Sequence, residues 1–283
     1  MTITHLLQGI TIALLVCACV KQTDKNDKNS WIVSIPPLKY IVESITEQDF
    51  PIEILLPPGA TPETYEPTPA QMIALSDSRL VFTTGLIDFE RQLSERFSNT
   101  IAENRIVNLS ENISLITGAH NHTGHKGTDP HIWTSPAALK QMASTAYRQI
   151  ALLYPDSTRY AVNYRNLLSR LDSLDRTLRT RFSASDKKYF LIYHPALTYM
   201  ARDYGIEQIP LEEDGKEPSV DRLQKIIRQA QNDGIRKLFY QSQFSRASVV
   251  ALASEIGAEA IEIDPLQENV VENLNRIANQ ISE

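Results

Sequence analysis

Cysteine is almost absent from this chain of 283 residues. The two cysteines, Cys17 and Cys19, both lie in an apolar segment near the N-terminus. The body of the protein therefore offers no thiol for a disulfide or for a thiolate metal site. Any metal ion that the body binds must be held by nitrogen and oxygen atoms, which means by histidine and carboxylate side chains.

Clustered positive charge is also scarce, because the longest runs of adjacent basic residues are pairs. The formal net charge is -6, and the sequence pI is about 5.6. Proteins that bind nucleic acids draw most of their affinity from clustered lysine and arginine side chains. We therefore expect no nucleic-acid partner.

Three common catalytic motifs are missing as well. The chain contains no HExxH pair, no GxSxG nucleophile turn and no glycine-rich loop of the kind that binds phosphates. We therefore expect that the protein is not an enzyme. A metal-dependent hydrolase is an alternative, because a metal ion held by histidines and carboxylates can also activate water.

The N-terminal segment has the features of a targeting signal. It reads LLQGITIALLVCAC, which has the length of a signal-peptide core and is too short for a comfortable membrane span. Its end resembles a bacterial lipobox, so we expect residues 1–18 to be a signal peptide and Cys19 to be acylated. The charged residues 19–30 would then be a tether at a membrane. An uncleaved anchor and a plain secretory signal are the alternatives, because MTITH lacks lysine and arginine.

Short apolar or β-branched runs alternate with helical patterns along the rest of the chain. This alternation is typical of βαβ units around a parallel sheet, and it occurs twice. We therefore predict an α/β fold with two (β/α)4-type lobes, at residues 31–155 and 184–283. The expected strands contain WIVSIP, IEILLP, LVFTTG and IVNLS in the first lobe and YFLIYH, EQIPL, KLFYQ and AEAIEID in the second.

Residues 156–183, between the two lobes, repeat leucines at helical spacing and predict one long helix. Asp156 or Ser157 can cap its N-terminus. A helix in this position would join the lobes as a strut and would resist hinge bending. Packing against only one lobe is the alternative.

The histidines are unevenly distributed. His120, His122 and His125 lie in GAHNHTGHKG, a loop whose composition suggests that it gathers metal, although a solvated polar insertion is the alternative. His131 follows in the stiff segment DPHIW. His194 ends YFLIYH, at the carboxyl end of a strand, where open α/β sheets place ligand-binding groups. A hydrogen-bonded structural histidine is the alternative for each of these two.

Two carboxylates occupy comparable places in the two lobes. Glu63 lies in the proline-rich segment PPGATPETYEP, and Asp264 ends the last expected strand in AIEIDPL. Each alone could be a solvated or turn-forming residue. Together with His131 and His194 they supply two ligands from each lobe, in a cleft between the lobes. Such a set of four is complete for a divalent cation.

Other acidic residues near these positions have simpler interpretations. Glu66 competes with Glu63, but a role at the start of the next helix suits it better, because carboxylates stabilise free N–H groups there. Residues 212–214 read EED and are expected to form a solvated turn, with an approach to the rim of the cleft as the alternative.

Taken in order, several segments resemble the cluster A-I solute-binding proteins of bacterial zinc and manganese ABC transporters. The resemblance covers essentially the whole mature chain, and it implies two (β/α) lobes joined by one long helix, with the metal between them. By this resemblance, His131 and His194 match two histidine ligands of the family, and Asp264 matches its carboxylate. Glu63 departs from the pattern, because many members have histidine there, in P-H-T-Y-E-P. The segments are IPPLKYIVESI, PPGATPETYEPTPAQMIALSDSRLVFTTG, DPHIWTSP, YHPALTYMARDYGI, EPSVDRLQKII and IDPL.

The resemblance implies a protein that captures a divalent metal ion and delivers it to a membrane permease. Zinc is the expected ion, because the Irving–Williams order favours it and because zinc-type members carry a histidine-rich loop. Manganese is the alternative, since a set with two carboxylates is comparatively hard. A surface adhesin is a further alternative. We expect a monomer outside the cytoplasm, anchored to a bacterial membrane by lipid.

Overall fold

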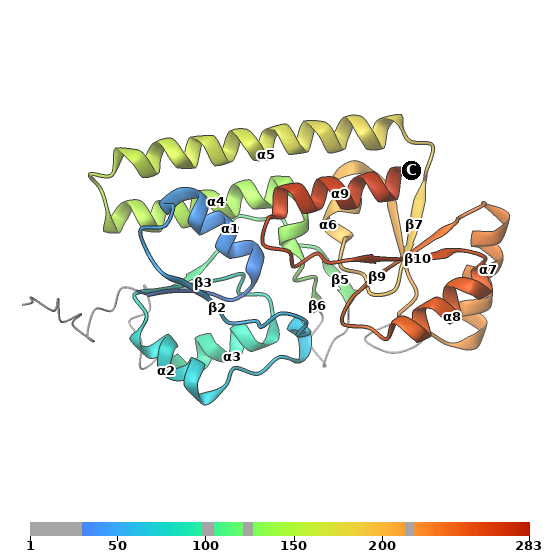
Figure 1. The fold of residues 1–283 in the computed structure, drawn as a ribbon, viewed down its shortest axis with the longest axis horizontal. Coiled ribbons are helices and arrows are strands. Elements are labelled where there is room, and N and C mark those ends of the chain that lie inside the picture. The colour runs from blue at the N-terminus through green and yellow to red at the C-terminus, as the bar shows by residue number, and fades with distance from the viewer. Residues whose placement is uncertain (1–29, 98–104, 121–126, 213–217) are drawn as a thin grey trace, which may run out of the picture.

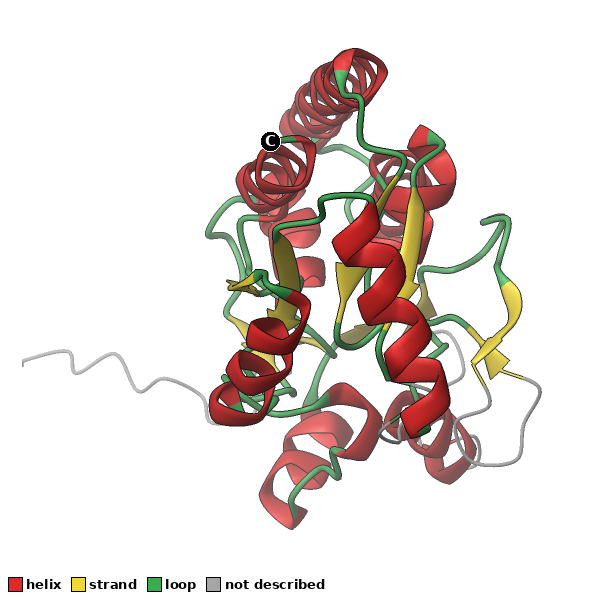
Figure 2. Ribbon diagram, turned by 90° about the vertical axis from the view of Figure 1, so that its right-hand side faces the viewer, coloured by secondary structure: helices red, strands yellow, loops and turns green. Residues whose placement is uncertain are grey.

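The structure is a computed structural model that describes residues 30–97, 105–120, 127–212 and 218–283. Two four-stranded parallel sheets lie side by side under one long helix (Figure 1). In Figure 2 helices flank the central strands on both sides. The predicted fold class, an α/β fold with two parallel-sheet lobes and a joining helix, is confirmed.

The first lobe contains a sheet with the strand order β2-β1-β3-β4. Neighbouring strands are all parallel, because each is connected to the next through a helix or a long crossover. Its elements are β1 (Trp31–Val33), α1 (Pro36–Thr46), β2 (Ile52–Ile54), the 3-10 turn η1 (Pro62–Thr64), α2 (Pro69–Asp77), β3 (Leu80–Thr83), α3 (Asp88–Phe97), β4 (Ile106–Asn108), η4 (Ile132–Thr134) and α4 (Pro136–Leu153).

The second lobe repeats this arrangement with the strand order β10-β9-β7-β8. The chain leaves β7 towards β8 on one side and then returns to β9 on the other side. The order therefore reverses between β7 and β9, and ligands of open α/β sheets bind beside such a reversal. The elements are β7 (Tyr189–Ile192), α6 (Thr198–Tyr204), β8 (Glu207–Pro210), α7 (Val220–Asn232), β9 (Lys237–Gln241), α8 (Arg246–Ile256), β10 (Glu259–Ile263) and α9 (Val270–Ser282).

Helix α5 (Thr158–Ala184) runs along both lobes, as Figure 1 shows. Ser157 caps it, because the Ser157 side chain accepts a hydrogen bond from the N–H of Tyr160. The helix packs against α1 and α4 of the first lobe and against α9 of the second. Its buried stripe includes Leu167, Leu171 and Leu178, which recur at helical spacing. The prediction of one long helix is confirmed, with a start two residues later than expected.

The hydrophobic core continues from one lobe into the other. A single cluster of buried side chains includes Trp31 of β1, Leu171 of α5, Phe190 of β7 and Leu274 of α9. A smaller cluster lies between β7, β9 and the helices α7 and α8. Because α5 and the shared core connect the lobes, their relative movement must repack buried side chains and is expected to be small.

One element was not expected from the sequence. Strands β5 (Thr117–His120) and β6 (Gly127–Thr128) form a short antiparallel hairpin. His120 ends β5 and pairs with Gly127 of β6, and His122 and His125 stand between these two residues in the sequence. Within the described residues, no helix combines the length and the apolar character that a membrane crossing requires.

Candidate metal centre

Glu63 is presented by a turn that several contacts hold in place. It is the central residue of η1, with Pro62 before it. The hydroxyl of Tyr65 donates to the carbonyl oxygen of Leu55 at 2.8 Å, and its ring packs edge-on against Phe89. The proline-rich segment therefore holds a carboxylate whose side chain is 20% exposed at the junction of the lobes. This explains the conformational restriction that the sequence shows here.

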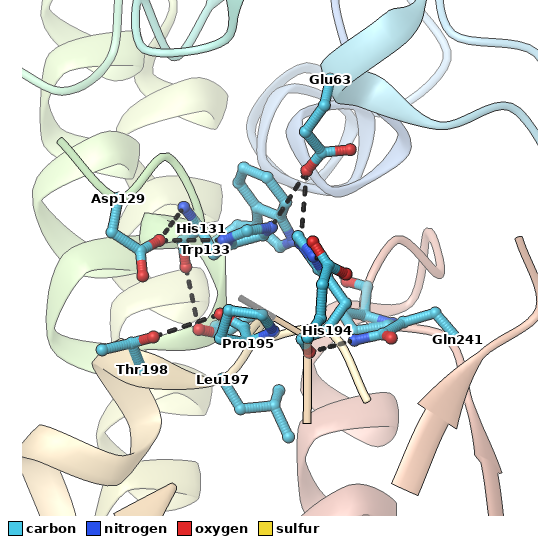
Figure 3. A network of polar contacts seen from close by, with 12 residues as sticks. Glu63, Asp129, His131, Trp133, His194, Pro195, Leu197, Thr198 and Gln241 are labelled. Carbon is cyan, nitrogen blue, oxygen red and sulfur yellow. Dashed lines mark hydrogen bonds and ion pairs between the residues drawn. The ribbon is translucent and has the colours of Figure 1, made fainter. Parts of the chain in front are cut away.

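His131 is buried in the segment that leads into η4. Its Nδ1 lies 2.9 Å from Oδ1 of Asp129, and the same oxygen accepts the backbone N–H of His131. The hydroxyl of Tyr199, from helix α6 of the second lobe, donates to the carbonyl oxygen of Asp129 at 2.8 Å. The His131 ring is thereby fixed with Nε2 directed towards Glu63 (Figure 3).

His194 lies two residues beyond β7, beside the reversal of strand order in the second sheet. Its Nδ1 lies 3.1 Å from Oε2 of Glu212, and its carbonyl oxygen accepts a hydrogen bond from Nε2 of Gln241 at 2.9 Å. The ring of Phe244 stacks on the imidazole, with the ring centroids 5.7 Å apart. Both the backbone and the ring of His194 are therefore held from the second lobe.

The three side chains point towards one another, as Figure 3 shows. Oε1 of Glu63 lies 3.4 Å from Nε2 of His131 and 3.5 Å from Nε2 of His194. These separations exceed the usual N–H···O range of about 2.7–3.2 Å. They are close to the distance between ligand atoms of a tetrahedral zinc ion, which is about 3.3–3.4 Å for bonds of about 2.0–2.1 Å. The donor atoms thus fit a small divalent cation.

The electrostatics of the cluster favour positive charge at its centre. Burial acts to raise the pKa of Glu63, but the two imidazoles outweigh burial and hold it well below its usual value. Burial acts to lower the pKa of His131, but Asp129 and Glu63 outweigh burial and raise it to about 10. The pKa of His194 is raised too, because Glu212 and Glu63 outweigh its burial. A divalent cation would supply this positive charge in place of protons.

Asp264 is followed by Pro265 and Leu266, which line the same pocket as this cluster, but Asp264 itself is engaged locally. Its Oδ1 accepts the N–H of Leu266 at 2.9 Å, and its carbonyl oxygen accepts a hydrogen bond from Asn273. Burial raises the pKa of its carboxyl group. Among the described residues, the side chains that converge within 4.8 Å of one another are Glu63, His131 and His194. The structure thus brings together three of the four predicted ligands.

The remaining sequence candidates have different positions. Glu66 is exposed, and the helix that follows begins with a capping box made by Thr68 and Gln71. His120 belongs to strand β5. His122, His125 and the lipidation candidate Cys19 lie outside the described residues.

The prediction of a solvated turn at residues 212–214 is wrong for Glu212. This residue is 7% exposed and contacts His194, because the pairing of β8 with β7 carries it inward. Residues 213 and 214 lie outside the described residues. Sequence analysis also missed Gln241, which ends β9, and Phe244, which follows β9. His194 follows a different strand, β7. Asp129 could have been found, since it stands two residues before His131 in the DPH sequence.

The sequence profile of a protein family described as zinc-uptake complex component A, periplasmic, matches residues 32–282. The chain belongs to this family. The expected relationship to bacterial metal-binding solute-binding proteins is thereby confirmed, and the members of the zinc-uptake component A family are transport proteins.

Individual proteins and solved structures are also similar to this chain. The high-affinity zinc uptake system protein ZnuA of Bacillus subtilis is 27% identical over 273 residues, which cover 90% of this chain and 85% of that protein. The zinc-binding lipoprotein AdcA of Streptococcus pneumoniae is 22% identical and covers 98% of this chain, which spans only 58% of AdcA. A zinc-bound crystal structure of a ZnuA deletion mutant has a TM-score of 0.81 and 33% identity, covering 89% of this chain and 96% of the other.

Proposed function

We propose that this protein is the solute-binding protein of an ABC transporter, which captures a zinc ion and delivers it to a membrane permease. The observation that carries the proposal is the convergence of Glu63, His131 and His194, because Oε1 of Glu63 lies 3.4 and 3.5 Å from Nε2 of the two histidines, close to the edge length of a tetrahedron around zinc. Zinc is supported by the two imidazoles and by the relatives that are named for zinc. Manganese is the alternative cargo.

We further propose that Asp264 supplies the fourth ligand. A carboxylate has two oxygens, so Oδ2 can bind the ion while Oδ1 keeps the N–H of Leu266. The segment is held at the site, because Nε1 of Trp133 donates to the carbonyl oxygen of Pro265 at 3.1 Å. Four protein ligands would leave no open position for a reacting water, which agrees with transport and not with hydrolysis.

The rest of the proposal, which concerns how the ion reaches the centre and leaves it, rests on the sequence. His120, His122 and His125 are proposed to gather metal beside the segment that carries His131. Acylated Cys19 is proposed to anchor the protein outside the cytoplasm, with residues 19–30 as the tether after a signal peptide of residues 1–18. The loaded protein is proposed to dock on its permease as a monomer.

Calorimetric titration of the metal-stripped protein tests this function. Zinc is expected to bind tightly at one site, and manganese more weakly. Replacement of Glu63 by alanine should weaken zinc binding by roughly two orders of magnitude, because it removes one ligand of four. Glu66→Ala is the matched control, since Glu66 is exposed three residues further along the same segment, and it should bind zinc as the natural protein does. Comparable affinity for manganese would contradict zinc as the cargo, and an unchanged Glu63→Ala would remove Glu63 from the ligand set.

A further inference from the structure

The pairing of β7 with β8 places Glu212 beside His194. Ile192 and Pro210 are partners in this parallel pair, and His194 and Glu212 each stand two residues further on. The backbone pairing continues past the strand ends, because the N–H of Glu212 donates to the carbonyl oxygen of Tyr193 at 2.9 Å. Residues at matching positions on neighbouring strands point to the same face. The register therefore brings the carboxylate to the ring nitrogen.

The contact between these two side chains is buried and specific. Oε2 of Glu212 lies 3.1 Å from Nδ1 of His194, and the two side chains are 7% and 8% exposed. A histidine that binds a metal through Nε2 must carry its proton on Nδ1, and that N–H needs an acceptor when it is buried. A charged carboxylate is the strongest acceptor that a side chain offers. Glu212 therefore favours the ring form in which Nε2 presents its lone pair to Glu63 and the ion.

The same relation exists on the other side of the centre, where Oδ1 of Asp129 lies 2.9 Å from Nδ1 of His131. Each of the two imidazoles thus has a carboxylate behind it and Glu63 in front of it. The two carboxylates come from different lobes and from unrelated local structures. Because a carboxylate contacts Nδ1 of each ring, both rings direct Nε2 to the same place, where one ion can bind between them.

We propose that Glu212 is a positioning residue of the zinc site, which holds His194 in the Nδ1-protonated form and strengthens its Nε2 as a ligand. Glu212 acts through His194 and does not itself contact the ion. This inference rests on the proposed zinc-binding function. It extends the functional residues beyond the ligands to an acidic residue in the segment that follows β8.

Two substitutions separate the hydrogen bond from the charge. Glu212→Leu removes both, whereas Glu212→Gln keeps an oxygen that can accept from Nδ1 and removes only the charge. Glu207→Gln, on the exposed start of the same strand, is the matched control. Zinc affinity is measured by competition with a chelator at neutral pH. We expect Glu212→Leu to bind zinc roughly 10–100-fold more weakly, Glu212→Gln to lose less, and Glu207→Gln to be unchanged.

Nuclear magnetic resonance of the natural, zinc-loaded protein with labelled histidine gives a readout that needs no variant to fold. A proton on Nδ1 of His194, protected from exchange with solvent, is expected. In zinc-loaded Glu212→Gln this proton should remain but exchange faster.

Three results would overturn the inference. If the natural protein binds zinc and Glu212→Leu binds it equally well, the positioning role is wrong while the proposed function stands. A proton on Nε2 of His194 in the zinc-loaded protein would also show that the positioning role is wrong while the proposed function stands. If the natural protein binds no zinc, the proposed function fails, and this inference fails with it.

Discussion

The two buried histidines of the centre are supported in different ways. His131 receives its carboxylate from Asp129, two residues earlier in the same segment. His194 receives its carboxylate from Glu212, 18 residues later and just beyond the neighbouring strand β8, and its backbone is held by Gln241, 47 residues later. One ring is therefore oriented by a local turn, and the other by the assembled second sheet.

This difference has a consequence for how each half of the site forms. The Asp129 turn can form as soon as its own segment is ordered, because the hydrogen bonds join residues two positions apart. The surroundings of His194 require β7, β8 and β9 to be paired. Contacts between distant residues bear a larger entropy cost of ordering. We therefore expect the His194 half to be more sensitive to the integrity of the fold.

The largest effect is expected from removing either histidine. His131→Ala and His194→Ala should each weaken zinc binding at least about 100-fold. The binding free energy of a structural zinc site with four ligands is about 10–16 kcal/mol, which corresponds to roughly 3 kcal/mol per ligand. Calorimetric titration of the two variants measures this directly. Equal losses would support two equivalent ligands. A variant that binds zinc normally would show that its histidine is only structural.

Removal of zinc should lower the stability of both lobes together. At a free zinc concentration of about 1,000 times Kd, binding stabilises the folded state by about 4 kcal/mol. For a chain of this size, the melting temperature should then fall by roughly 8–16 °C when zinc is chelated. Scanning calorimetry should show one transition with and without zinc, because one core cluster includes residues of both lobes. Two separate transitions would contradict the shared core.

Removing the two supporting carboxylates should affect the metal-free protein unequally. Asp129→Ala should lower the free energy of unfolding by about 1–3 kcal/mol, because it leaves the buried backbone N–H of His131 without its acceptor. Glu212→Ala should cost less, because the backbone N–H of Glu212 keeps its partner. Urea denaturation of the two variants tests this order. The opposite order would mean that the local turn is the less important support.

A smaller effect is expected from Gln241→Met, which keeps the size of the side chain and removes the donor to the carbonyl oxygen of His194. The loss of one hydrogen bond of about 0.5–1.5 kcal/mol should weaken zinc binding by roughly two- to tenfold. Gln243→Met is the control, because Gln243 lines the same pocket and is less buried. A similar loss in both variants would assign the effect to the pocket lining and not to the His194 backbone.

The sequence predicted most of the fold because the signals of the fold are local. All eight expected strands are present, since runs such as WIVSIP and YFLIYH are apolar and lie between helical patterns. The long helix could be predicted from the spacing of its leucines. The β5–β6 hairpin was not predicted, because Thr117–His120 and Gly127–Thr128 are short and lack an apolar pattern.

The residues of the candidate site could be predicted where the neighbouring sequence marks them. Glu63 stands out through its prolines, and His131 and His194 stand out through their positions beside a rigid segment and a strand end. Glu212 could not be found in this way, because its role depends on the register between Ile192 and Pro210. Pattern analysis locates strands but does not give their pairing. The local engagement of Asp264 with Leu266 is likewise visible only in three dimensions.

The position of helix α9 late in the chain affects when the hydrophobic core can be completed. Helix α9 contributes Val270, Leu274 and Ile277 to the core that also contains Trp31 of the first strand. A chain that crosses a membrane unfolded, with its N-terminus first, would present these side chains only after the other described elements of both lobes have crossed. The core that the two lobes share would be incomplete until then, which would oppose folding inside the export channel.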